Sequence, residues 1–170
     1  SEDETVRREV RELIRRLRKH SEDVKRESDK LLDEIRRRVK EVEDRVKEAV
    51  ERLDRKKRDE RLRDVVEKID RLLEEVKDRI RKVERDSKEM NKKDEERVER
   101  VVRKLEEILD REGVDEDVVR KIRTVVKKIE EDNKKTADEL RKLHKDIKKE
   151  VDDMEKRIRK VLDEIDKEIK

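Results

Sequence analysis

The stretch that decides the fold runs from Val6 to Leu53 and reads VRREVRELIRRLRKHSEDVKRESDKLLDEIRRRVKEVEDRVKEAVERL. Its core-type positions recur in steps of 4-3-4-4-3, which add up to 18 residues, or five turns of an α-helix. A strict seven-residue repeat would instead force the helix into a supercoil. The spacing therefore predicts one long, nearly straight helix with a narrow buried face, formed by Val6, Val10, Leu13, Leu17, Ser21, Val24, Ser28, Leu31, Ile35, Val39, Val42, Val46, Val50 and Leu53.

The first helix boundary follows from the phase of this pattern. The apolar positions stop at Leu53 and resume at Leu62. Nine residues at about 100° each would place the two sets on opposite faces of a continuous helix. A short turn is therefore predicted at about residues 56–58, with Asp59 as the N-cap of the next helix.

The second boundary lies at Gly113, the only glycine in the chain. Glycine is typical of the position just past a helix end, and Asp115 is a suitable N-cap for the helix that follows. Val114 and Val119 have the spacing of a hydrophobic staple around that cap. At the start of the first helix, Ser1 and Glu4 have the spacing of a capping box.

These boundaries predict helices over about 2–55, 59–111 and 115–169. Short connections make neighbouring helices antiparallel. The sequence thus predicts a single all-α domain over 1–170, a long antiparallel up-down-up three-helix bundle with nearly straight helices. The apolar positions of its second and third helices are Leu62, Val66, Ile69, Leu73, Val76, Ile80, Val83, Val98, Val101, Leu105 and Leu109, then Val118, Ile122, Val125, Ile129, Leu140, Ile147, Val151, Met154, Ile158, Leu162, Ile165 and Ile169.

Polar residues interrupt or border these apolar positions, and they form the candidate site. With the turns above, the first two helices align where residue numbers sum to about 114, and the last two where they sum to about 226, so polar residues of all three helices share levels. An unpaired buried polar group costs about 1–3 kcal/mol. We therefore expect a hydrogen-bonded network that rejects wrong helix registers, formed by His20, Ser21, Ser28, Ser87, Asn91, Asp94, Asn133, Thr136 and His144.

Several of these residues have a second interpretation. His20 is equally compatible with an exposed position, and either His144 or the neighbouring Leu143 could occupy the core. Met90 is an alternative to Asn91, and the Asp94 carboxylate could reach solvent at the bundle edge. Three of the polar segments also resemble helix starts, which would give six shorter helices; these segments begin at Ser21, Asp94 and Thr136.

The composition argues against most kinds of active or binding site. The chain has 56 basic and 53 acidic residues in close alternation and no aromatic residue, so neither a basic face nor a base-stacking surface for nucleic acid is expected. Cysteine is absent, and no apolar run could span a membrane. In the predicted alignment, His20 and His144 lie roughly 18 Å apart in height and cannot share a metal. We expect no catalytic residue, cofactor, metal or small-molecule substrate.

In these features the chain resembles de novo designed helical bundles with buried hydrogen-bond networks. The resemblance rests on the 18-residue spacing, the Val, Ile and Leu core, the charged surface, the loop at residues 113–117 and the shared polar levels. The first connection departs from that style, because it lacks Gly or Pro. The resemblance implies a soluble structural scaffold with no evolved biochemical activity and no required partner. The alternative is a self-associating or partner-binding coiled-coil assembly module, and a homo-oligomer stays open.

Overall fold

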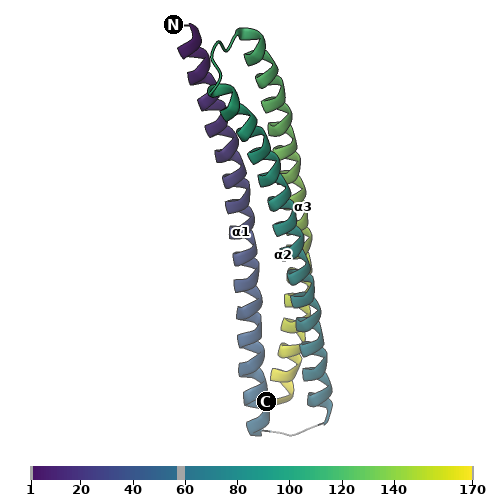
Figure 1. Ribbon diagram of the computed structural model, residues 1–170. Coiled ribbons are helices and arrows are strands. Elements are labelled where there is room, and N and C mark those ends of the chain that lie inside the picture. Colours follow the sequence, from purple (N-terminus) through teal and green to yellow (C-terminus); the bar gives the residue numbers. More distant parts are fainter. Residues whose placement is uncertain (1, 57–59, 170) are drawn as a thin grey trace. The chain divides into compact units, whose positions relative to one another are not determined.

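A computed structural model describes residues 2–56 and 60–169 of the chain, and the regular structure in these ranges is helical. The helices are α1 (Glu2–Lys56), α2 (Glu60–Leu109) and α3 (Glu116–Ile169), labelled in Figure 1. They pack against one another, which confirms the predicted all-α three-helix bundle. The predicted capping residues Ser1 and Asp59 lie outside the described residues, as does most of the first predicted turn.

Contacts divide the chain into two compact units, and every helix contributes a segment to each. Unit 1 consists of Ser1–Asp29 and Asp86–Arg141, and unit 2 consists of Lys30–Arg85 and Lys142–Lys170. The sequence predicted one domain over 1–170, and this stays a prediction.

In unit 1, α1 runs parallel to α3 and antiparallel to α2. Three ion pairs join α1 to α3, all between residues 114 apart in the chain: Arg16 with Glu130, Arg123 with Glu9, and Arg141 with Glu27. Between α1 and α2, residue numbers rise along one helix as they fall along the other. Arg7 near the start of α1 contacts Leu109 at the end of α2, and Ser21 contacts Asp94. Unit 2 has the same directions, as its pairs Arg38–Asp152, Arg36–Glu84 and Lys77–Glu43 show.

The buried face of α1 differs from the predicted one after Ser28. From Ser28 onward its buried positions follow a seven-residue repeat, where the sequence predicted a continuing 18-residue pattern. Leu31 and Val50, which were predicted as core, are only half-buried, and their neighbours Leu32 and Ala49 are buried instead. The buried positions of this segment are Ser28, Leu32, Ile35, Val39, Val42, Val46 and Ala49.

Three pairs of adjacent valines in α2 and α3 show the same one-residue difference. The first valine of each pair was predicted as core, but the second is the buried one. The clearest case is Val125, which is 45% exposed beside a neighbour that is 2% exposed. A core site for Val125 is therefore wrong, and the sites at Val101 and Val118 are only half-buried. The buried valines are Val102, Val119 and Val126.

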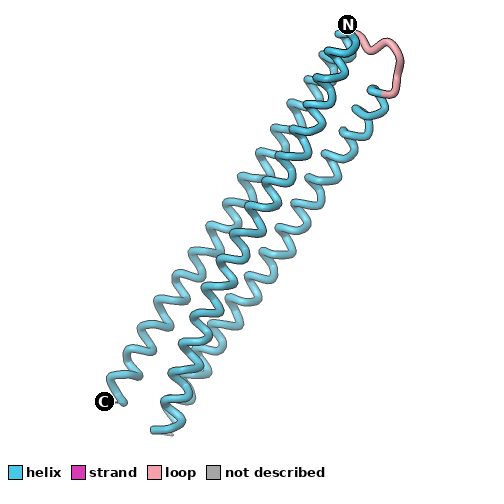
Figure 2. The backbone as a smooth tube through the Cα atoms, turned by 90° about the vertical axis from the view of Figure 1, so that its left-hand side faces the viewer, coloured by secondary structure: helices cyan, strands magenta, loops and turns pink. Residues whose placement is uncertain are grey.

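The connection between α2 and α3 is the pink segment of Figure 2. α2 ends at Leu109, two residues before its predicted end, and Gly113 adopts a φ of +71°, which L-residues rarely adopt. Asp115 caps α3 as predicted, because the backbone N–H of Val118 donates to Asp115 Oδ1 over 3.0 Å. Val114 and Val119 are buried in one cluster, which confirms the predicted staple.

Candidate functional site

The candidate site is built around the carboxylate of Asp94 in α2. Its side chain is 3% exposed, and Oδ2 accepts two hydrogen bonds. Ser21 Oγ donates from α1 over 3.1 Å, and Asn133 Nδ2 donates from α3 over 2.8 Å. One buried oxygen atom thus joins all three helices of unit 1. We call Ser21, Asp94 and Asn133 the polar layer.

The helical register explains why these three side chains meet. Asp94 follows Ser87 by seven residues and precedes Val98 by four, and all three are buried on one face of α2. Ser21 and Asn133 differ by 112 in residue number, which is the offset that the predicted sums of 114 and 226 imply. The structure therefore places these three predicted residues at one level. The alternative in which Asp94 reaches solvent is wrong, because Asp94 is buried.

A second polar contact lies beside the polar layer. Thr136, 6% exposed, accepts a hydrogen bond from Arg97 Nη2 over 3.3 Å and donates to the backbone carbonyl of Asp132 over 3.1 Å. Arg97 Nη1 also lies 3.9 Å from Asp132 Oδ2. This contact ties α2 to α3 once more. Thr136 was predicted from the sequence but Arg97 was not, since an arginine at a half-buried position looks like any other surface residue.

Other predicted residues lie outside the hydrogen-bonded group. His20 is exposed, so its assignment to a buried network is wrong. Ser21 occupies the inward position instead, and adjacent residues on a helix point about 100° apart. Asn91 is half-buried and lines a surface hollow with Ser21. The six-helix alternative is also wrong, because Ser21, Asp94 and Thr136 all lie inside continuous helices.

Ser28 and Ser87 are the most buried of the predicted polar residues. They are 2% and 1% exposed, and neither hydroxyl has a hydrogen-bond partner among the described residues. Their residue numbers sum to 115, as do those of Ser21 and Asp94. A buried polar group without a partner costs about 1–3 kcal/mol. These two serines therefore share the level predicted for them but do not form the predicted hydrogen bonds.

The last predicted polar residue, His144, belongs to unit 2. It is 3% exposed, whereas Leu143 is half-buried. Of the two alternatives left open by the sequence, the histidine thus occupies the core position.

Arg7 makes a contact that the sequence analysis did not anticipate. Its guanidinium donates to the backbone carbonyls of Leu109 and Arg111, at the end of α2. The last carbonyls of a helix lack partners within the helix, and a cation there also interacts favourably with the helix dipole. α2 has no basic residue in its own last turn, so α1 supplies the charge. The lack of a basic residue in the last turn of α2 was the sequence signal that could have indicated this contact.

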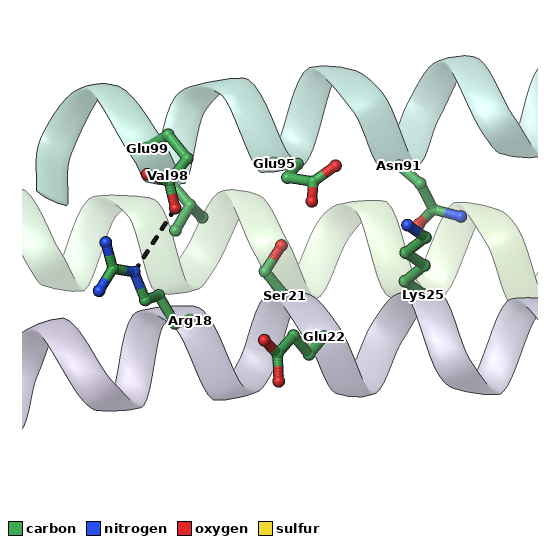
Figure 3. A pocket seen from close by; sticks show the side chains of 8 residues that line it. All are labelled: Arg18, Ser21, Glu22, Lys25, Asn91, Glu95, Val98 and Glu99. Atoms are coloured by element: carbon green, nitrogen blue, oxygen red, sulfur yellow. Dashed lines mark ion pairs between the residues drawn. The ribbon is translucent and has the colours of Figure 1, made fainter.

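A hollow of about 290 Å³ lies beside Ser21, between α1 and α2. Figure 3 shows the side chains that line it. Ser21 and Val98 face it, and the charged side chains around it include the ion pair between Arg18 Nε and Glu99 Oε1 at 3.5 Å. The described side chains that line the hollow include both acidic and basic groups, and they do not form a nucleophile paired with a general base. Among the described residues no group of three or more His, Cys, Asp or Glu side chains could hold a metal ion.

In unit 2 three arginines surround the carboxylate of Glu155. Its carboxylate accepts a hydrogen bond from Arg38 over 2.8 Å, and Arg45 and Arg159 lie 3.6 and 3.2 Å away. The hydrogen bond from Arg38 is the main cause that holds the pKa of Glu155 below its usual 4.5, with the positive charges of the three arginines adding to it. The same bond raises the pKa of Arg38.

We expect Glu155→Gln to reduce stability at neutral pH but not in acid. A carboxyl group whose pKa is lowered by folding stabilises the native state above its ordinary pKa of 4.5, and this contribution disappears as pH falls through the folded value. The expected loss at neutral pH is below about 1 kcal/mol, because the group is partly hydrated. Urea unfolding at about pH 7 and about pH 3 measures it. The exposed Glu164→Gln is the control, and an equal loss at both pH values would contradict the prediction.

Comparison with known proteins identifies no relative of this chain. No family model, curated protein or solved structure matches the chain. The described residues contain no helix that is long and apolar enough to span a membrane.

Proposed function

We propose that this chain is a structural scaffold of the designed-bundle kind, without enzymatic activity, in which the polar layer sets the register of the helices. The observation that supports it is the buried Asp94 carboxylate, which accepts hydrogen bonds from α1 and α3 at once. Sliding either helix by one turn would move its donor by about 5 Å and break the bond. Each polar group stranded in this way costs about 1–3 kcal/mol.

The apolar part of the core discriminates little between the native helix register and a shifted one. Its buried side chains are almost all Val, Ile or Leu, repeated every three or four residues. After a slide of one repeat, each such side chain would meet another of similar size and chemistry. Long bundles with repetitive apolar layers therefore need a feature that penalises the alternatives. A hydrogen-bonded polar layer is a well-established feature of this kind in coiled coils.

A cysteine-pair variant tests the proposal. The chain has no cysteine, so Arg11→Cys and Lys135→Cys, both at exposed positions of unit 1, accept spin labels at two defined sites. In the native register the labels are offset by about 15 Å along the helices, and a slide of seven residues changes that offset by about 10 Å. Electron spin resonance then reports the distance distribution. We expect one narrow distance.

The decisive comparison removes the whole polar layer. Ser21→Ala, Asp94→Leu and Asn133→Leu together leave no buried polar group stranded, so the triple variant is expected to fold with similar or greater stability. We expect its distance distribution to broaden or to gain a second maximum. The control is Ser28→Val with Ser87→Val, which removes two buried hydroxyls outside the hydrogen-bonded layer. A single unchanged distance in the triple variant would refute the register function.

One observation favours the rival function, an assembly module. Val125 is 45% exposed, and it lies seven residues after Val118 and four before Ile129, so the three share a face of α3. Single exposed apolar residues are common on protein surfaces, which is why we place this function second. Measuring the mass in solution distinguishes the scaffold from the assembly module. A mass of one chain agrees with a scaffold that acts alone, and a mass of two or more chains, reduced by Val125→Lys, would favour the assembly module.

A further inference from the structure

We infer that unit 1 opens by itself, as a partially unfolded state in which unit 2 stays folded. Helices that run through both units would ordinarily suggest a single all-or-none transition. The distribution of apolar and polar side chains points to two transitions instead. This inference does not depend on the proposed scaffold function.

Each unit has its own apolar core. The main buried cluster of unit 1 and that of unit 2 share no residue. Proteins open locally in contiguous cooperative units, and a part of the chain with its own apolar core is a candidate for such a unit. The members in unit 1 are Val10, Leu13, Ile14, Leu17, Val98, Val102, Leu105, Ile122 and Val126. Those in unit 2 are Ile35, Val39, Val42, Val46, Ile69, Leu73, Val76, Ile80, Ile147, Val151, Met154 and Ile158.

The polar side chains make unit 1 the weaker of the two. Buried apolar residues are almost equally divided among the described residues, with 14 in unit 1 and 15 in unit 2. The buried polar residues are divided unequally, because five of the six in the described ranges belong to unit 1. Each of the five takes a position where an apolar side chain would contribute hydrophobic stabilisation. Within the described part of the chain, two of them, Ser28 and Ser87, also lack a hydrogen-bond partner for their hydroxyls.

These two serines lie at the boundary of unit 1. Ser28 is the last buried residue of unit 1 in α1, and Ser87 is the first in α2. Two of the three helices therefore contribute a serine, and not an apolar residue, as the outermost buried side chain of the described residues at this end of the unit.

Chain connectivity does not oppose this opening. When unit 1 unfolds, the segment 86–141 becomes a loop between two folded parts of unit 2. When unit 2 unfolds, the segment 30–85 becomes the equivalent loop, and the two segments are equal in length. Loop-closure entropy depends on length, so it favours neither order. The polar side chains then decide which unit opens first.

Native-state hydrogen exchange of the full chain, followed by mass spectrometry or NMR, tests the inference. We expect core amides of unit 1 (around residues 10–17, 98–105 and 122–126) to exchange about tenfold faster or more than those of unit 2 (around 35–46, 69–80 and 147–158). Their exchange should also depend less steeply on low concentrations of urea, because a partial opening exposes less surface than global unfolding. One common rate and one common urea dependence would overturn the inference.

Two matched valines sharpen the test, because Val102 in unit 1 and Val151 in unit 2 are both 0% exposed. Val151→Ala destabilises only the states in which unit 2 is folded, so it lowers the free energy needed to open unit 2 but not that needed to open unit 1 alone. It should speed exchange in unit 2 by about tenfold or more and exchange in unit 1 by much less. Val102→Ala should speed exchange in both units, since unit 1 is open in the partial and in the global state. Equal acceleration of exchange in both units of Val151→Ala would show a single cooperative unit. Ile158→Val, a milder change in unit 2, gives the same test should Val151→Ala not fold.

Discussion

Replacing Asn133 with aspartate is expected to destabilise the fold by about 3–5 kcal/mol. Asn133 Nδ2 lies 2.8 Å from Asp94 Oδ2, and both side chains are less than 8% exposed. The substitution changes the shape of the side chain very little. It removes the donor, however, and sets a second carboxylate against the first where water cannot screen the repulsion. Urea unfolding at neutral pH measures the loss.

The reciprocal substitutions separate charge from packing. In Asp94→Asn the new side chain keeps a carbonyl oxygen that can accept from Ser21 and Asn133, so we expect stability within about 1 kcal/mol of the native chain. The double variant Asp94→Asn with Asn133→Asp again contains one carboxylate and one amide, and it should recover most of the loss. A double variant no more stable than Asn133→Asp alone would show that these two side chains are not bonded to each other.

The second large effect is expected at Leu32. Its side chain is 4% exposed in α1, and Leu32→Ala should cost about 2–5 kcal/mol through lost transfer free energy and the cavity left behind. Leu31→Ala is the matched control, with the same substitution one residue earlier. Because Leu31 is only half-buried, we expect a loss of about 1 kcal/mol.

Thermal or urea unfolding of the two leucine variants also decides between two helical repeats. The 18-residue spacing makes Leu31 the core residue, and the seven-residue repeat of the structure makes Leu32 the core residue. If Leu31→Ala were the more damaging change, the buried face of α1 beyond Ser28 would be misplaced.

Most of the architecture could be predicted from the sequence because apolar spacing and caps act locally. Three runs of regularly spaced apolar residues, one glycine and the Asp115 cap were enough to predict the positions of the helices and their antiparallel order. What the spacing could not decide was which member of an adjacent apolar pair, such as Val125 and Val126, is buried. Both fit a helical stripe, and the choice depends on how far the neighbouring helices wind around each other.

The candidate site was predictable in part. Residue-number sums placed Ser21, Asp94 and Asn133 at one level, because all three occupy inward positions of long helices. The same sums could not exclude His20, which lies at that height but on an outward face. The contacts of Arg7 and Arg97 were missed, since a long flexible side chain on a charged surface has many equally plausible partners.

The side-chain amide of Asn133 offers the most direct test of the central claim, that one buried carboxylate ties α1 and α3 to α2. In an NMR spectrum of the native chain its two amide protons should exchange slowly with solvent. They should also show through-space contacts to the β-protons of Asp94, which sits 39 residues away in the chain. An Asn133 amide that exchanges as fast as that of a solvent-exposed asparagine, with no contact to Asp94, would contradict the claim.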